Sequence, residues 1–265
     1  MTARAAARPA RQPLPPLTDP PLSARDVCLT DVYVWELPVR LTHWLTAGSL
    51  FVLAATGVYI GHPFLISAGP ASERFVMGTV KLVHFYAAIV FTLSVLSRVA
   101  WMFLGNKYAS WNKLIPVHER RLRALIPTLQ FYLFAHRKPP GFVGHNPVAG
   151  LAYTAVFLLF FLEIGTGFAL YAASAGVDSP MRVFAFLGPL FGGLQTARFL
   201  HHVAMWLLLG FTAHHVYSSL LMSQVERNAT VESIFSGHKF VPREDLIYSG
   251  YRFEDREPPD EEGAA

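Results

Sequence analysis

The sequence has 265 residues, of which 52% are hydrophobic and only 15% are charged, and its formal net charge is +4. The mean hydropathy of +0.34 is too high for an ordinary soluble domain and is typical of a membrane protein. The aromatic residues lie inside the apolar stretches rather than among the basic residues, which argues against nucleic-acid binding.

The N-terminal region is rich in Pro, Ala and Arg and has no apolar core of signal-peptide length. We therefore predict that residues 1–32 form a disordered cytoplasmic tail. This tail contains Cys28, the single cysteine of the chain. One cysteine cannot form an internal disulfide, a thiolate cluster or a c-type haem attachment, so any metal must be bound by histidine or oxygen ligands.

Four apolar segments follow, and each exceeds the ~20 residues that a helix needs to cross a hydrocarbon core. They comprise residues 39–60, 80–103, 150–172 and 199–222. Buried helices of a soluble protein are the alternative, which four segments of this length in one short chain disfavour. The sequence predicts an all-α fold, with an integral membrane four-helix bundle in residues 33–225 and a cytoplasmic C-terminal tail in residues 226–265.

The basic residues outside these segments are unevenly distributed. With Arg40 at the start of the first segment counted in the N-terminal region, seventeen lie in the two terminal regions and in the 104–149 connection, whereas the other two connections contain only Arg74, Arg182 and Arg198. Because cytoplasmic loops retain Lys and Arg during insertion, we predict a multi-pass protein of the cytoplasmic (inner) membrane with both termini in the cytoplasm.

The 104–149 connection between the second and third spans contains HERRLRALIPTLQFYLFAH, which begins at His118 and mixes basic and apolar residues at near-helical spacing. We expect an amphipathic segment that lies along the cytoplasmic interface, interrupted at Pro127. A solvated linker is the alternative.

Histidines inside the spans are the candidate functional residues, because ionisable side chains in a bilayer are costly and are usually retained for function. The six are His43, His84, His201, His202, His214 and His215. The directions of His201 and His215 around the helix axis differ by about 40°, so the two residues lie on nearly the same face. They are ~21 Å apart along the axis. This spacing suits one haem near each membrane surface.

The predicted topology supplies a second histidine at each depth. His43 lies about one turn into the first span from the cytoplasm, and His84 about one turn into the second span from outside. We predict two haem b groups, one held by His43 and His215 and the other by His84 and His201. A six-coordinate bis-histidine iron has no open site and fits an electron carrier.

Other readings of these histidines stay open at this point. His202 or His214 could replace its neighbour after a rotation of about 100°. Membrane histidines also serve as packing residues or as proton relays.

Three further features of the spans concern the predicted haems. Arg40 and Arg98 lie near the cytoplasmic surface and are predicted to pair with the propionates of the inner haem. Glu163, in the middle of the third span, has no obvious partner in the sequence and is either neutral or part of a proton path. Three glycines could leave room for a flat macrocycle or for close helix contacts: Gly57, Gly167 and Gly210.

Several motifs resemble the b-type cytochrome subunit of membrane-bound nickel-iron hydrogenases, over roughly residues 33–239. They are WELPVRLTHW, TGVYIG, KLVHF, RVAW with GNKY, GHNP, TGFALY and HHVAMW with HHVY. The resemblance places ligands on His43, His84, His201 and His215. This sequence departs from the family pattern at Arg198, where a histidine is expected, and at Glu163, where an apolar residue is expected.

The resemblance implies a partner and a direction of electron transfer. The partner would be a periplasm-facing hydrogenase with a large subunit and an iron–sulfur small subunit. Electrons would enter at the outer haem, pass to the inner haem and reduce membrane quinone, so that this chain would carry electrons without being the hydrogenase itself. The alternatives are the cytochrome b subunit of formate dehydrogenase or thiosulfate reductase, and a haem-free proton or ion transporter.

Overall fold

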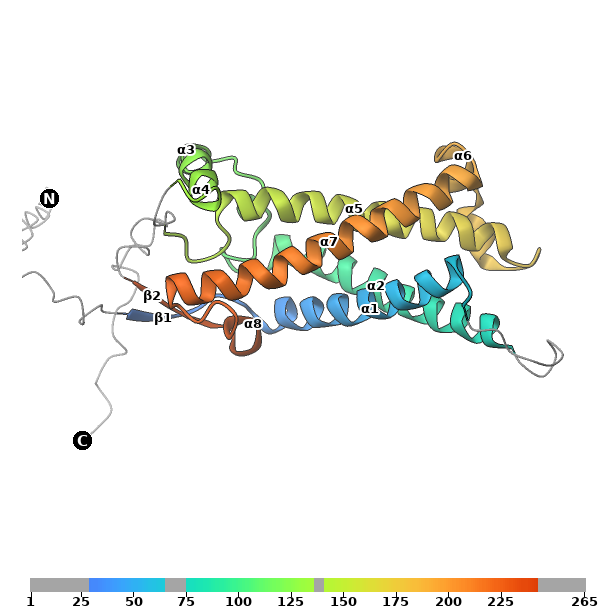
Figure 1. Ribbon diagram of the computed structural model, residues 1–265, viewed down its shortest axis with the longest axis horizontal. Coiled ribbons are helices and arrows are strands. Elements are labelled where there is room, and N and C mark those ends of the chain that lie inside the picture. The colour runs from blue at the N-terminus through green and yellow to red at the C-terminus, as the bar shows by residue number, and fades with distance from the viewer. Residues whose placement is uncertain (1–28, 65–74, 136–140, 243–265) are drawn as a thin grey trace, which may run out of the picture.

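The computed structural model describes residues 29–64, 75–135 and 141–242, and these are mostly helical. Four long helices run side by side along the long axis (Figure 1). They are α1 (Leu37–Gly61), α2 (Val76–Leu104), α5 (Pro147–Ser174) and α7 (Leu194–Glu226). Each contains one of the predicted apolar segments and extends beyond it at both ends, because a helix can continue past the hydrocarbon core.

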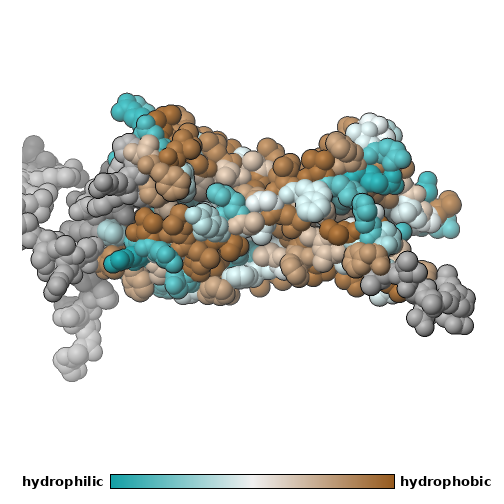
Figure 2. Space-filling model, viewed as in Figure 1, coloured by the Kyte–Doolittle hydropathy of each residue, from teal (hydrophilic) through white to brown (hydrophobic). Residues whose placement is uncertain are grey.

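Three of these helices, α1, α2 and α5, are each long and apolar enough to cross a membrane. Within the described residues α7 meets this criterion only together with the segment Pro180–Leu190, from which it is bent by 88°. Its four histidines lower its hydropathy. Figure 2 shows a surface that is largely hydrophobic along the helices, with hydrophilic residues mainly toward the two ends.

The short helices lie at the two ends of the long ones (Figure 1). At one end are α3, α4 and α8, and α3 and α4 fall within the predicted amphipathic segment. Pro127 lies in the first turn of α4, where its missing N–H is not needed. The short helices are η1 (Trp111–Lys113), α3 (Glu119–Arg123), α4 (Leu125–Tyr132) and α8 (Ser233–Ser236), with η2 (Pro180–Phe186) and α6 (Leu187–Leu190) at the other end.

The all-α prediction needs one correction, because two strands form an antiparallel sheet beside α8. β1 (Leu29–Tyr33) pairs with β2 (His238–Pro242), and one valine of each strand, Val32 and Val241, is buried. The predicted tail boundary at residue 32 therefore falls inside a strand. The rest of the predicted N-terminal tail, residues 1–28, and the C-terminal residues 243–265 lie outside the described residues.

The long helices pack mainly as two pairs, α1 with α2 and α5 with α7. An apolar cluster joins the pairs near mid-length: Phe91 and Val95 of α2, Val156 and Phe160 of α5, and Leu208 of α7. A second cluster lies at the sheet end and includes Val34, Trp35 and Val143. Side chains at other levels between the two helix pairs form the candidate site.

Candidate functional site

Two histidine pairs connect the two helix pairs. The ring centres of His43 on α1 and His215 on α7 are 6.3 Å apart. Those of His84 on α2 and His201 on α7 are 6.5 Å apart. Both predicted pairs are therefore adjacent, and Leu208 of the central apolar cluster lies midway between them along α7.

The separation within each pair fits two imidazoles on opposite sides of one metal ion. An imidazole nitrogen binds a transition metal at about 2.0 Å and lies about 1.1 Å from its own ring centre, so such rings have centres about 6.2 Å apart. Haem iron needs only two ligands from the protein. The described residues contain no group of three or more His, Cys, Asp or Glu side chains that could hold a metal ion.

Hydrogen bonds indicate which ring nitrogen of His84 is free. The Thr56 hydroxyl donates to the carbonyl of Val52 at 2.7 Å, and its oxygen lies 2.7 Å from Nδ1 of His84. Because the hydroxyl hydrogen is already used, the oxygen accepts from Nδ1–H of His84. That tautomer leaves Nε2 without hydrogen, as a metal ligand requires.

The same arrangement recurs at His201. Thr166 donates to the carbonyl of Leu162 at 2.6 Å, and its oxygen lies 2.9 Å from Nδ1 of His201. The glycine after each threonine lies against the same histidine. A Cβ atom at Gly57 would be 3.6 Å from Cε1 of His84, and one at Gly167 would be 3.4 Å from Cε1 of His201. Thus each Thr-Gly pair supports one imidazole.

The His43–His215 pair is held differently. The Tyr153 hydroxyl lies 3.2 Å from Nδ1 of His215, and the Phe211 ring stacks on the His215 ring at 5.6 Å. His43 meets the edge of the Trp44 ring at 5.1 Å. Nδ1 of His43 is buried and has no hydrogen-bond partner in the described part of the chain.

The two arginines predicted to pair with propionates each have an unsatisfied nitrogen. Arg98 donates from Nη2 to the carbonyl of Ala109 at 3.2 Å, while its Nη1 is buried without a partner among the described residues. Arg40 donates to the carbonyl of Phe235, and its Nε is likewise buried and unpaired there. Both side chains thus retain a donor for an anionic group.

The neighbouring histidines take other positions. Nδ1 of His202 lies 2.8 Å from the carbonyl of Arg198, and its Nε2 would be 3.0 Å from a Cβ atom at Gly61. His214 is exposed. A Cβ atom at Gly210 would meet nothing within 4 Å, so that glycine borders open space.

Sequence reasoning missed the groups that contact the histidine rings. Glu163, which had no evident partner, lies with Oε2 2.6 Å from Nδ1 of His201. Thr56, Thr166 and Tyr153 were not singled out. The Thr-Gly dipeptide shared by TGVYIG and TGFALY was an available signal, because it occurs twice in spans that face a histidine helix.

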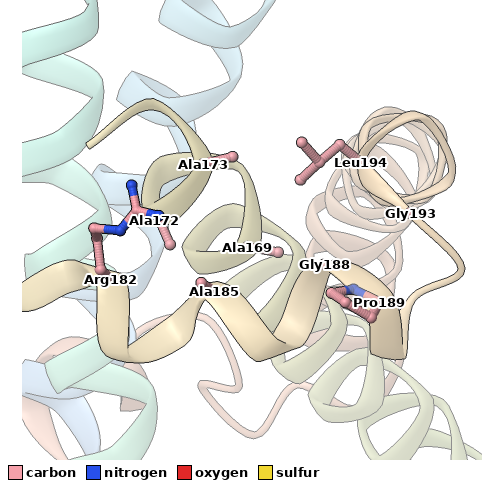
Figure 3. A pocket seen from close by; sticks show the side chains of 9 residues that line it. All are labelled: Ala169, Ala172, Ala173, Arg182, Ala185, Gly188, Pro189, Gly193 and Leu194. Atoms are coloured by element: carbon pink, nitrogen blue, oxygen red, sulfur yellow. The ribbon is translucent and has the colours of Figure 1, made fainter. Parts of the chain in front are cut away.

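A separate cavity of about 320 Å³ lies between α5, η2, α6 and the start of α7 (Figure 3). Its lining is mostly small and apolar, for example Ala169, Ala172 and Gly188, and Arg182 is the charged member. None of the four paired histidines lines it, so we assign it no part in the site.

Comparison with known proteins identifies the family. A model of the family described as prokaryotic cytochrome b561 matches residues 34–237, which is most of the chain and includes all four paired histidines. The chain belongs to the prokaryotic cytochrome b561 family. Membership in a b-type cytochrome family supports haem b as the cofactor of this cytochrome.

Several relatives of this cytochrome are named as probable B-type cytochrome subunits of Ni/Fe-hydrogenases. It is 39% identical over 212 residues to the probable Ni/Fe-hydrogenase B-type cytochrome subunit of Azotobacter vinelandii, covering 78% of this chain and 88% of that protein. The protein of that name from Cupriavidus necator is 36% identical, with 84% and 92% covered. The probable Ni/Fe-hydrogenase 1 B-type cytochrome subunit of Escherichia coli is also 36% identical, with 78% and 92% covered. The resemblance seen in the sequence motifs is confirmed.

Proposed function

We propose that this chain is the membrane subunit that carries electrons from a periplasm-facing nickel-iron hydrogenase to the quinone pool through two b haems. His43 and His215 would hold one haem, and His84 and His201 the other. The observation that carries the proposal is the pair of histidine contacts, with ring centres 6.3 and 6.5 Å apart. The names of the relatives support the hydrogenase partner.

Bound haem b supplies a one-electron redox couple. Each haem would be held by two histidines of this chain, which would leave no place for oxygen or substrate to bind the iron. The apolar side chains of Phe91, Phe160 and Leu208 pack between the two levels and exclude water. Arg40 and Arg98 would hold the propionates of the haem at the His43–His215 pair, since each retains an unpaired donor there.

The orientation that we propose follows from the charges at the two ends. The end with β1, β2, α3 and α4 carries most of the described Lys and Arg residues outside the spans, whereas the η2–α6 end carries Arg182 and Arg198. Cytoplasmic loops retain positive charge, so we propose a four-helix transmembrane bundle with the sheet end in the cytoplasm. The His84–His201 pair would then face the periplasm, where the hydrogenase would bind.

Haem stoichiometry tests this function. We expect two b haems for each purified wild-type chain, with the sharp reduced absorption bands of bis-histidine ligation. His84→Ala should leave one haem and abolish hydrogen-dependent quinone reduction. His202→Ala is the matched control on the same helix as His201 and should retain two.

Three results would contradict the proposal in whole or in part. A colourless wild-type protein would favour the haem-free transporter. Loss of a haem from His202→Ala, with retention of both in His84→Ala, would refute the ligand assignment. Copurification with a different oxidoreductase would keep the haems but replace the hydrogenase as the partner.

A further inference from the structure

The two histidine pairs differ in the charge of the groups that contact their Nδ1 atoms. At the His84–His201 pair, the Glu163 carboxylate lies 2.6 Å from Nδ1 of His201. At the His43–His215 pair, the corresponding contact is the neutral Tyr153 hydroxyl, 3.2 Å from Nδ1 of His215. Among the described residues, a carboxylate contacts the ring of only one of these pairs.

The charge of Glu163 lies next to His201. The Thr166 oxygen accepts from Nδ1–H of His201, and the Glu163 carboxylate lies beside the same nitrogen. The second carboxylate oxygen, Oε1, is buried and has no hydrogen-bond partner in the described residues. The side chains of Glu163 and His201 are 12% and 23% exposed, so water screens their interaction weakly.

A carboxylate beside Nδ1–H polarises that bond and makes the imidazole a stronger electron donor at Nε2. A more basic histidine ligand stabilises the oxidised, more positive iron and so lowers its reduction potential, because the surroundings of the ligand are one of the means by which a protein sets that potential. A full negative charge at this distance in a weakly screened site has a large effect. The neutral Tyr153 contact, at its greater length, should have a smaller one.

We propose that Glu163 is a positioning residue that holds the reduction potential of the His84–His201 site below that of the His43–His215 site. This inference rests on the proposed function. With this ordering, electron transfer from the first site to the second is energetically downhill, in the direction needed for hydrogen oxidation. Each transfer removes one electron from one iron and adds one to the other, and it needs no further reactant.

A redox titration of the purified complex, followed by haem absorbance, tests the proposal. Wild type should show two one-electron steps. Glu163→Gln keeps the size and an acceptor oxygen but removes the charge. We expect it to raise the lower midpoint potential by about 59 mV, which is a tenfold change in the equilibrium for one electron, and to leave the upper step in place. The electron paramagnetic resonance signal of the low-potential ferric haem should shift with it.

Tyr153→Phe is the matched control at the other pair. It removes the hydroxyl near His215 and should alter only the upper step. Equal midpoint potentials in Glu163→Gln and wild type, or equal shifts of both steps, would overturn the proposal while leaving the two haems intact.

A second measurement applies even if Glu163→Gln loses a haem. His84→Ala in an otherwise wild-type chain should remove the low-potential step and leave the high-potential step. If the remaining step is the low one, Glu163 does not set the order and the inference is wrong. Absence of any haem in wild type would instead refute the proposed function.

Discussion

The hydrogen on Nδ1 of His84 and His201 decides what these two residues can bind. An imidazole presents one bare nitrogen, and the partner of the other nitrogen determines which one it is. At both residues a threonine that already donates to its own helix accepts this hydrogen. Two hydroxyl groups therefore leave both Nε2 atoms without hydrogen, as a metal ligand requires, and also restrain the rotation of the rings.

Thr56→Val should weaken haem binding at the His84–His201 site. Valine has the shape of threonine but cannot accept Nδ1–H of His84, and loss of such a supporting partner typically costs about 10–100-fold in metal-site affinity. The measurement is the rate of haem transfer from the purified protein to apomyoglobin. Thr212→Val is the control, because within the described part of the chain the Thr212 hydroxyl bonds only to the carbonyl of Leu208 in its own helix. Equal rates in the two variants would contradict the role of Thr56.

The sequence could predict the depth of each histidine but not the neighbours of its ring. Depth follows from 1.5 Å per residue along a helix, so His43 and His215, or His84 and His201, could be matched without coordinates. The contact of Glu163 with His201 depends on the rotation of α5 against α7. Rotation is weakly encoded here, because nearly every side of α5 is apolar.

Among the helices, α5 has a well-defined start. Asn146 precedes the helix, its side-chain oxygen accepts from the backbone N–H of Ala149 at 2.8 Å, and Pro147 occupies the first helical position. This is the usual combination of an N-cap with an N1 proline. The cap fixes where α5 begins and therefore sets the levels of Tyr153 and Thr166.

Asn146→Ala should destabilise the protein by about 1 kcal/mol, because it removes the N-cap oxygen. Asn146 also donates to the Tyr132 hydroxyl at 3.0 Å, and Tyr132→Phe separates the two contacts. It removes the hydroxyl that accepts from Asn146 and leaves the capping oxygen in place. The measurement is the unfolding midpoint in mixed micelles with increasing denaturing detergent. Equal losses in the two variants would show that the Tyr132 contact, rather than the cap, supplies the stability.

Helix positions were predictable, whereas the strand pair was not. The apolar segments are long, and each helix contains the whole of its predicted segment. β1 and β2 have five residues each and are separated by more than 200 positions. Nothing in the sequence of either strand specifies the other. Their pairing depends on the start of α1 and the end of α7 lying at the same end of the molecule. Glu36 helps to hold that end together by accepting from the Trp101 indole and from the Asn106 backbone, both at 2.8 Å.

In the molecule as a whole, histidine pairs and apolar cores alternate along the axis. The sheet-end core comes first, then the His43–His215 pair, the central apolar cluster and the His84–His201 pair. The helix pairs α1–α2 and α5–α7 would hold the haems between them, because α7 carries one histidine of each pair and α1 and α2 carry the others. Bound haem would thus join the two halves, and we attribute the sparse direct packing between them to this arrangement.

The sheet end also contains a histidine that should make stability depend on pH. The ring of His145 lies 4.9 Å from that of Trp35 and 4.7 Å from that of Tyr153. Burial, together with the positive charges of Arg98, Lys239 and Arg121, lowers the pKa of His145 from 6.5 to about 3. The unfolded chain therefore binds a proton at His145 below about pH 6.5 that the folded chain does not bind until about pH 3.

The contribution of His145 to the free energy of unfolding should therefore be constant above about pH 6.5 and should fall as the pH drops toward 3. At pH 5 the loss from this residue is at most about 2 kcal/mol, from 1.36 kcal/mol for each unit between 5 and the unfolded pKa. Unfolding midpoints at pH 7.5 and 5.0 should differ less in His145→Gln than in wild type, because glutamine does not titrate. His118→Gln, at an exposed position before α3, should leave the wild-type difference unchanged. If His145→Gln keeps the full difference, protonation at another residue causes the acid sensitivity of this end of the molecule.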